Sequence, residues 1–362
     1  MPELDSLRGV AILAVVFYHG LFWSNNLVGL SGAVRIAVNL SRFGWLGVNL
    51  FFVLSGFLIT GILTNLKVAP NYFSQFYFRR AVRILPALYA LLFVLCLTPH
   101  QSYKYLLLSF FFCGNLAPLI HIPYTYGVLW SLAVEEHFYL LWPWAVRRFG
   151  KQALYLLIAM LLLGAPVMRG VAFARPLPDG FGIFTWQACD GIASGALLAL
   201  LVREFWMTRR RLAGLSCLSL LLAGLGFAAG APFGILTRTE PVGAILLLSL
   251  INLTFLGVVG IAMWCASGTR ASLVDWRILN FYGNISYGLY LYHSLIFETY
   301  DWSRPLLWPN ALAVMGRPWL LFLRMVIVLV LATGIAYFSR WYFEEIFLKL
   351  KLQPRKATEL QN

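Results

Sequence analysis

Charged residues are scarce in this sequence. Of its 362 residues only 12% are charged and 14 are Asp or Glu, whereas soluble globular domains contain about 25% charged residues. Hydrophobic residues make up 60% of the chain, and the mean hydropathy is +0.77. No long polar stretch interrupts the apolar runs, so we expect no sizeable soluble domain. This composition excludes an ordinary soluble protein and is typical of a protein that crosses the membrane several times.

Cysteine is rare as well, and its pattern excludes two kinds of site. The cysteines are Cys96, Cys113, Cys189, Cys217 and Cys265. They are scattered in apolar surroundings, with no CxxC pair and no His/Cys cluster. The sequence therefore predicts neither a disulfide framework nor a metal site, and no resident cofactor is expected.

The sequence also lacks internal repeats and nucleic-acid-binding motifs. Its formal net charge of +14 is therefore attributed to arginines that face the cytoplasm and anionic lipid, and no nucleic acid partner is expected. The two halves of the chain do not echo each other in Gly/Pro-broken helices, as they do in many transporters. This absence argues against a transporter.

Long apolar runs predict an all-α integral membrane protein with about ten spans. A spanning helix needs about 20 apolar residues. Runs of this kind lie at 9–29, 44–66, 84–102, 128–146, 152–168, 184–202, 212–230, 242–266, 284–300 and 318–343. An eleventh apolar stretch, 105–120, contains Pro118 and is followed by Pro123.

Loop charges decide how this eleventh stretch is interpreted. Lysine and arginine accumulate on the cytoplasmic side of membrane proteins. With ten spans and a cytoplasmic N-terminus, 17 of them fall inside and 8 outside, Arg169 among the outer ones. Counting 105–120 as a span would move Arg147, Arg148 and Lys151 outside and invert every later loop. We therefore predict that both termini are cytoplasmic and that 105–120 is re-entrant or lies at the outer surface. The transmembrane domain is predicted over 1–350, followed by a basic cytoplasmic tail, 351–362.

The first predicted span contains ionisable side chains. Arg8 and His19 are eleven residues apart, about three helical turns, so they share a face with His19 roughly 16 Å further along. Asp5 lies one turn before Arg8 on that face. An ionisable residue inside a span is a functional hypothesis by default, and histidine suits a general base near neutral pH. The alternative is a histidine that only hydrogen-bonds a neighbouring helix.

A second motif, WSLAVEEHFYLLWP, covers residues 130–143. Glu135 has Ser131 and Tyr139 at helical spacing on either side. A carboxylate here could orient an imidazole and stabilise its protonated form. The alternative is a structural ion pair with an arginine inside the membrane. The aromatic residues of the motif suit either an interfacial belt or a stacking surface for a sugar ring.

A third motif, FYFRRAVRILPALY, covers residues 76–89. It places Arg79, Arg80 and Arg83 at the cytoplasmic entry of the third predicted span. Their spacing makes a compact cluster on a helix, and arginine forks suit phosphate recognition. The alternative is plain positive-inside anchoring. Arg83 extends further into the apolar run than anchoring requires, which favours an anionic ligand.

Two further motifs carry weaker signals. GVNLFFVLSGFLITG, residues 47–61, contains small residues that let helices approach closely, and Asn49 is its one candidate for substrate contact. NISYGLYLYHSLI, residues 284–296, contains Tyr287 and His293, which are either structural or line a substrate cavity.

Taken together, the motifs resemble those of the acyltransferase 3 family of membrane acyltransferases. The family includes bacterial enzymes that O-acetylate lipopolysaccharide O-antigen, exopolysaccharides and Nod factors. The resemblance runs from LDSLRGVAILAVVFYH (4–19) through LFFVLSGFLIT (50–60), FYFRRAVRILP (76–86), SLAVEEHFY (131–139) and SYGLYLYH (286–293) to YFEEIFLKL (342–350). One departure is Ile346, at a position that is often proline in the family. The resemblance implies ten spans, cytoplasmic termini, a bacterial inner-membrane location and the form without an extra esterase-like domain.

The resemblance also implies an activity: transfer of an acetyl or other short acyl group from acyl-CoA to a hydroxyl of a saccharide or glycolipid. In this hypothesis His19 removes the proton from the acceptor hydroxyl, or takes the acyl group itself, while Glu135 holds its ring. Arg8 and Asp5 are assigned to the catalytic set with His19 and Glu135. The donor phosphates would be bound by Arg79, Arg80 and Arg83, together with Arg8 at the cytoplasmic mouth. The remaining substrate-binding candidates are Asn49, Ser131, Tyr139, Tyr287 and His293.

Two other functions stay open at this point. One is a non-enzymatic transporter or flippase for a glycolipid that uses the same polar cavity. The other is an acyltransferase that acts on a small molecule such as a macrolide.

Overall fold

The chain folds into helices. The computed structural model describes residues 1–23, 30, 32–98, 101–175, 182–266 and 276–350, and the regular elements within these ranges are all helical. The predicted all-α class is therefore confirmed. The predicted basic tail, 351–362, lies outside the described residues, as do residues 24–29 of the first predicted span.

Each of the ten predicted segments falls on a helix of at least 16 residues. These helices are α1 (Pro2–Phe17), α3 (Leu46–Leu66), α4 (Tyr72–Cys96), α6 (Leu129–Arg148), α7 (Lys151–Ala174), α8 (Thr185–Leu201), α9 (Arg209–Gly230), α10 (Pro241–Ala266), α12 (Ser286–Leu307) and α13 (Ala311–Phe338). Within the described ranges, six continuous helical segments are long and apolar enough to cross a membrane. They contain α1, α3, α7, α9, α10 and α13. The number of spans and the side on which the termini lie stay predictions.

Helices α4, α6, α8 and α12 are too short or too polar to meet this criterion for a membrane span. Together they carry most of the candidate site residues. Helix α8 has 17 residues, and the other three contain several charged side chains. Charges lower the mean hydropathy of a helix even where they face the interior of a bundle, which is where intramembrane charges belong. A helix that carries polar site residues therefore has a lower mean hydropathy, and its sequence indicates a membrane span less clearly.

Shorter elements connect the long helices. They are α2 (Gly32–Ser41), α5 (Tyr103–Phe110), α11 (Arg277–Asn284), α14 (Glu344–Leu348), the 3₁₀ turns Arg42–Trp45, Gly114–Ile120 and Ala231–Phe233, and the π-helical turns Tyr18–Trp23 and Ser339–Phe343. The stretch 105–120 falls on α5 and the 3₁₀ turn after it. Eight residues of α-helix extend about 12 Å, far less than the roughly 30 Å hydrocarbon core, so no spanning helix forms there, as predicted.

Two details of the sequence prediction are wrong. Helix α4 begins at Tyr72, not near residue 84, so its three arginines lie inside the helix. Arginine is a good helix former, and two of these side chains turn towards a cavity instead of ending the helix. Arg169, counted in an outer loop, lies inside α7 with 0% of its surface exposed and pairs with Asp190 of α8 at 3.0 Å. A paired arginine can lie within a bundle, so it carries no information about loops.

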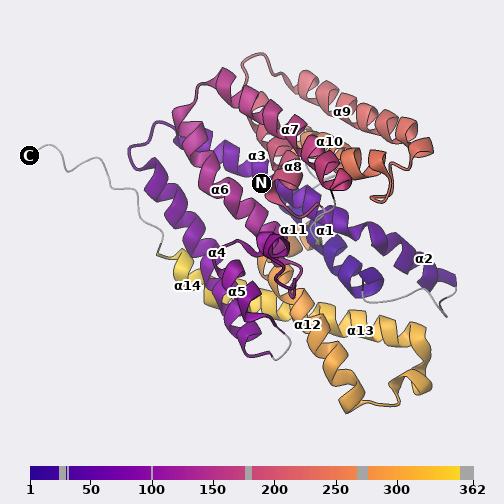
Figure 1. Ribbon diagram of the computed structural model, residues 1–362. Coiled ribbons are helices and arrows are strands. Elements are labelled where there is room, and N and C mark those ends of the chain that lie inside the picture. The colour runs from indigo at the N-terminus through magenta and orange to yellow at the C-terminus, as the bar shows by residue number, and fades with distance from the viewer. Residues whose placement is uncertain (24–29, 31, 99–100, 176–181, 267–275, 351–362) are drawn as a thin grey trace, which may run out of the picture.

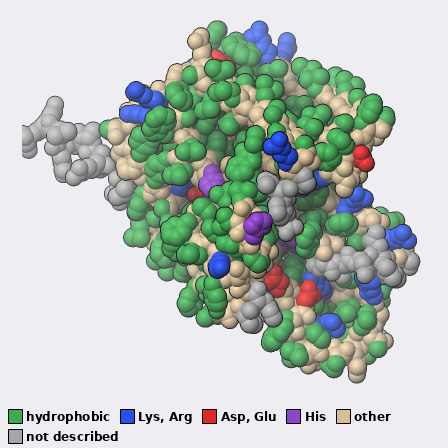
Figure 2. Space-filling view, in the orientation of Figure 1, with side chains coloured by type: hydrophobic (Ala, Val, Ile, Leu, Met, Phe, Trp, Pro, Cys, Tyr) green, Lys and Arg blue, Asp and Glu red, His purple; other side chains and the backbone are tan. Residues whose placement is uncertain are grey.

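Helices α1 and α3 form the middle of the bundle. Helix α3 packs on α1, α8, α6 and α10, while α9 packs on α10 and α13 on α12. Figure 1 shows α7, α9 and α10 on one side of α1 and the α12–α13 pair on the other. Many hydrophobic side chains, such as Phe93, Leu163 and Val330, are exposed on the long helices. Figure 2 shows hydrophobic side chains over most of the visible face, as expected for a surface that contacts lipid.

Glycines allow the central helices to touch. A methyl group at Gly195 of α8 would overlap the carbonyl oxygen of Val53 in α3, and one at Gly56 of α3 would overlap that of Ile192 in α8. The backbones of α3 and α8 are therefore in direct contact, as small residues at helix interfaces permit. The packing role predicted for the glycines of 47–61 is confirmed at Gly56.

We expect Gly195→Ala to destabilise the protein by about 1–3 kcal/mol, because the added methyl group forces the α3 and α8 backbones apart. The measurement is the apparent unfolding temperature in detergent. Gly164→Ala is the matched control, since this glycine of α7 has nothing within 4 Å of the added carbon. Equal unfolding temperatures for the two variants would contradict the close contact.

Candidate active site

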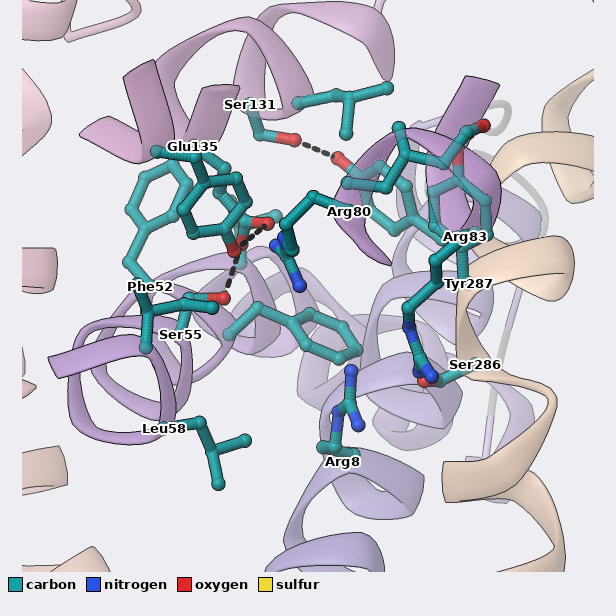
Figure 3. A pocket seen from close by; sticks show the side chains of 17 residues that line it. Arg8, Phe52, Ser55, Leu58, Arg80, Arg83, Ser131, Glu135, Ser286 and Tyr287 are labelled. Atoms are coloured by element: carbon teal, nitrogen blue, oxygen red, sulfur yellow. Dashed lines mark hydrogen bonds between the residues drawn. The ribbon is translucent and has the colours of Figure 1, made fainter. Parts of the chain in front are cut away.

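Two cavities lie end to end in the centre of the bundle. The first, called the arginine chamber, is bordered by α1, α3, α4, α6 and α12 and has a volume of about 100 Å³. Its polar lining consists of Arg8, Ser55, Arg80, Arg83, Ser131, Glu135, Tyr139, Ser286, Tyr287 and Tyr290. Figure 3 shows the guanidinium groups of Arg8, Arg80 and Arg83 converging on one space.

Positive charge exceeds negative charge in the arginine chamber. Arg8 lies 3.9 Å from Asp5, and the guanidinium of Arg80 lies 3.8 Å from the centre of the Tyr139 ring. Within the described part of the chain, no carboxylate oxygen lies within 4.0 Å of Arg80 or Arg83. A buried charge without a counter-ion is costly. The chamber therefore suits an anionic group, and the planar forks of arginine suit a phosphate.

Glu135 is held by two hydroxyl groups of the same chamber. Ser55 Oγ donates to one carboxylate oxygen at 2.9 Å, and the Tyr139 hydroxyl donates to the other at 3.0 Å (Figure 3). The expectation that Glu135 holds the His19 ring is therefore wrong in this structure, because both of its oxygens are engaged elsewhere. Sequence reasoning assigned the stretch around Ser55 to packing. The one feature of the sequence that could have indicated the role of Ser55 is that its hydroxyl is the single polar side-chain group in the otherwise apolar segment 50–59.

The second cavity, called the histidine chamber, is larger, with a volume of about 470 Å³. It is lined by the π-helical turn after α1, the segment before α6, and the later turns of α12. Its aromatic and ionisable lining consists of Tyr18, His19, Trp23, Trp45, Tyr124, Trp130, Tyr290, Glu298 and Asp301. Flat aromatic faces beside carboxylates can bind a molecule that has both apolar faces and hydroxyl groups.

Helix α13 fixes the turn that carries His19. Arg324 donates to both carboxylate oxygens of Asp301, at 2.7 and 2.6 Å, and to the carbonyl oxygen of Gly20 at 2.5 Å. A methyl group at Gly20 would overlap the side chains of Met325 and Phe297, which would have to shift to accept it. Single π turns inside helices are frequent at functional sites because they redirect a side chain. Here the turn directs His19 into the histidine chamber.

The partner of His19 is a second histidine. His293 Nε2 lies 3.1 Å from His19 Nδ1, and each ring also places its Nδ1 3.0 Å from a backbone carbonyl oxygen, of Val15 for His19 and of Leu289 for His293. A carbonyl oxygen only accepts, so both Nδ1 atoms carry hydrogen. The one Nδ1 hydrogen of His19 is shared between the Val15 carbonyl oxygen and His293 Nε2, and Ser294 Oγ also lies 3.3 Å from that Nε2. The Nε2 atom of neutral His19 is therefore the basic one. His293 can stabilise a charged His19 ring by accepting its Nδ1 hydrogen.

Most predicted site residues gather at these two cavities. His19 lines the histidine chamber, with the buried His293 behind it. The arginine chamber contains Arg8, Arg80, Arg83, Ser131, Glu135, Tyr139 and Tyr287. The Ser131 hydroxyl is bonded to Tyr290, and the Tyr287 hydroxyl donates to the carbonyl oxygen of Ile84 at 2.7 Å.

Three predicted residues lie elsewhere. Arg79 is exposed on α4 and lines neither chamber. Asn49 is buried and donates to Asn252 of α10 at 2.9 Å, which is a contact between helices. Asp5 lines neither chamber and reaches the site only through Arg8.

Tyr290, from the motif predicted to be structural or to line a substrate cavity, borders both chambers. Sequence reasoning did not single out Glu298 and Asp301, which add negative charge to the histidine chamber. The available signal was the pair of acidic residues in and just after the apolar run 284–300, since acids inside spans mark polar pathways.

The two histidines give a spectroscopic prediction. In ¹⁵N spectra of protein labelled at histidine, we expect both His19 and His293 to show a protonated Nδ1 and an unprotonated Nε2 at neutral pH, because carbonyl oxygens fix the hydrogens. His19→Asn and His293→Asn assign the signals, and the exposed His121 serves as the solvent-facing reference. A protonated Nε2 on neutral His293 would contradict the geometry.

Comparisons with known proteins place the chain in a family. The family model described as an acyltransferase domain, that of acyltransferase 3, matches residues 1–341. Peptidoglycan O-acetyltransferase OatA of Listeria monocytogenes is 28% identical over 87% of this chain and 53% of its own length. YrhL of Bacillus subtilis is 29% identical over 81% of this chain and 48% of its own length, and O-acetyltransferase OatA of Staphylococcus aureus is 32% identical over 40% and 24%.

The chain spans about half the length of the first two of these relatives. No solved structure gives a significant match to it. The family match covers all five motifs that contribute side chains to the two chambers. The chain belongs to the acyltransferase 3 family and is an integral membrane protein of the bacterial type.

Proposed function

We propose that this protein transfers an acetyl or other short acyl group from acyl-CoA to a hydroxyl of a saccharide or glycolipid. One observation carries the proposal: a cationic chamber and a chamber with a basic histidine adjoin each other in the centre of the bundle. The first suits the phosphates of a donor, and the second suits an acceptor whose hydroxyl must lose a proton.

The donor is placed in the arginine chamber. Coenzyme A carries several phosphates, and Arg8, Arg80 and Arg83 converge where Glu135 is the one carboxylate in the lining. Glu135 and Glu136 act on Arg80 electrostatically and Glu344 acts on Arg83, but no carboxylate oxygen of the described residues lies within 4.0 Å of either side chain. Phosphate oxygens would give both arginines closer charged partners. Arg8 lies on α1 and His19 in the π-helical turn that directly follows it, about 16 Å further along, so a donor bound at its phosphates extends along α1 towards the histidine.

The acceptor is placed in the histidine chamber. The rings of Trp23, Trp45 and Trp130 offer faces for a sugar ring, and the Glu298 carboxylate offers acceptors for its hydroxyl groups. The larger volume of this chamber fits a bulky acceptor. Since all three relatives carry O-acetyltransferase names, two of which specify peptidoglycan, we take a cell-wall saccharide as the first acceptor to test.

His19 acts as the general base in this proposal. Its Nε2 removes the proton as the acceptor oxygen attacks the thioester carbonyl, and the carbon–sulfur bond breaks to release the CoA thiolate, which then takes that proton from the ring. The His19 Nδ1 hydrogen remains on its bond to His293 throughout. General-base help is typically worth about 10²–10⁴-fold in rate. A covalent route, in which the ring itself carries the acyl group, uses the same atoms.

The proposed topology has ten spans with both termini in the cytoplasm. The N-terminal end of α1 then points to the cytoplasm, so the arginine chamber opens towards the cytoplasmic pool of acyl-CoA. The histidine chamber opens towards the opposite side, where cell-wall saccharides are found.

We expect His19→Ala to lose at least about 10²-fold of acyl transfer, because the base is removed. The assay is label transfer from radiolabelled acetyl-CoA to peptidoglycan fragments in membranes with matched expression. His121→Ala, at an exposed position outside both chambers, should retain wild-type transfer.

Robust transfer by His19→Ala would refute the base. If the wild type moves a labelled glycolipid across vesicles but consumes no acetyl-CoA, the protein is a transporter. If it accepts only small molecules such as macrolides, the saccharide assignment is wrong.

A pair of arginine variants tests the donor site. We expect Arg83→Gln to raise the KM for acetyl-CoA about tenfold or more, since one charge-assisted contact to a phosphate is lost. Arg79→Gln removes the same charge from an exposed position of the same helix and should leave this KM near the wild-type value. Equal effects of the two substitutions would mean that general positive charge, not the arginine chamber, attracts the donor.

A further inference from the structure

The boundary between the two chambers consists of two side chains. Val48 of α3 and Tyr290 of α12 line both the arginine chamber and the histidine chamber, and the other lining residues belong to one chamber only. His19 therefore faces one side of this boundary, while Arg80, Arg83 and Glu135 face the other. Because Val48 and Tyr290 border both chambers, the space between them is the route by which a donor held by the arginines would meet His19.

Resting on the proposed function, we infer that Val48 and Tyr290 form the passage through which the acyl group reaches His19, and that their bulk restricts transfer to short acyl chains. The acyl group is the leading end of a donor whose phosphates stay among the arginines. The acyl group therefore has to fit between Val48 and Tyr290 before its carbonyl carbon comes near His19.

The Tyr290 side of the passage is held by a hydrogen bond. The Tyr290 hydroxyl lies 2.5 Å from Ser131 Oγ of α6, and Ser131 also donates to the carbonyl oxygen of Val128 at 3.3 Å. With its single hydrogen directed to Val128, Ser131 accepts from Tyr290. The Tyr290 ring also contacts Phe51 edge-on, with ring centres 6.1 Å apart. These contacts fix the ring across the boundary.

The Val48 side of the passage cannot retreat. Its neighbour Gly47 lies against the backbone of α1, where even a methyl group would overlap the carbonyl oxygen of Ala11. The α3 backbone is thus already in contact with α1 at this level. Any widening of the passage has to come from the Tyr290 side chain, which makes Tyr290 the main determinant of acyl length and Val48 the second.

The test is a series of acyl-CoA donors, from acetyl to butyryl to hexanoyl, with the acceptor that the wild type uses. For each variant we compare kcat/KM for butyryl-CoA with that for acetyl-CoA. In Tyr290→Ala this ratio should rise about tenfold or more over the wild type, since a pocket distinguishes one methylene group by roughly 10–200-fold. Val48→Ala should raise the ratio in the same direction, by less.

Two control variants separate the effect of the Tyr290 ring's bulk from two other effects: loss of its hydrogen bond to Ser131, and removal of any tyrosine from the protein. Tyr290→Phe keeps the ring and loses the bond to Ser131, so its ratio should stay much closer to the wild-type ratio than that of Tyr290→Ala. Tyr103→Ala removes an exposed tyrosine of α5 outside both chambers and should leave the ratio unchanged.

Each outcome decides the proposal. An unchanged ratio in both Tyr290→Ala and Val48→Ala, with acetyl transfer retained, would overturn the passage and leave the proposed function intact. Loss of all transfer in both well-expressed variants would also overturn it, because residues that only limit length should still let an acetyl group through. If the wild type uses no acyl-CoA at all, the proposed function itself fails, and the passage fails with it.

Discussion

The whole arrangement depends on the cost of placing charge inside an apolar bundle. Arg169 shows how the fold meets that cost when no ligand is involved. It donates to Asp190 at 3.0 Å, to Ser249 at 2.6 Å and to the carbonyl oxygens of Ile245 and Gln187, so its buried guanidinium is fully bonded. Arg80 and Arg83 lie among helices of the same bundle without such a partner in the described structure. Because leaving a buried charge uncompensated is expensive, the difference between the two sites marks the second as a place for an anion.

Close helix packing brings the chemistry of five separate segments together. The backbone of α3 contacts the backbones of α8 and α1 directly at glycines. A larger residue at these glycines would force the central helices apart. This packing places Ser55 of α3 beside Glu135 of α6 and brings His19 beside His293 of α12. The two cavities adjoin at Val48 and Tyr290 because α1, α3 and α12 converge there. A site of this kind needs rigid neighbours, since small displacements of a base from its substrate reduce catalysis.

Several features were predictable because they follow from local rules. The apolar runs predicted helical segments close to the observed ones, and the short, proline-containing stretch 105–120 was expected not to span. The charged residues of the arginine chamber and His19 were predicted because a charge or a histidine in an apolar run is costly enough to be noticed. The errors were also physical in origin. Arg79 could not be separated from Arg80 by spacing alone, because both lie in one cluster and only the rotation of α4 against its neighbours decides which one faces inwards.

The sequence by itself determined the helical class, the membrane setting and the family, because these depend on composition, hydrophobic period and ordered motifs along the chain. Only the tertiary structure decided the partners. It gave His19 a second histidine instead of Glu135, gave Glu135 the hydroxyl groups of Ser55 and Tyr139, and placed Tyr290 between the two chambers. These pairings join residues as many as 274 positions apart. They depend on how helices rotate and cross, and no local pattern in the chain records that geometry.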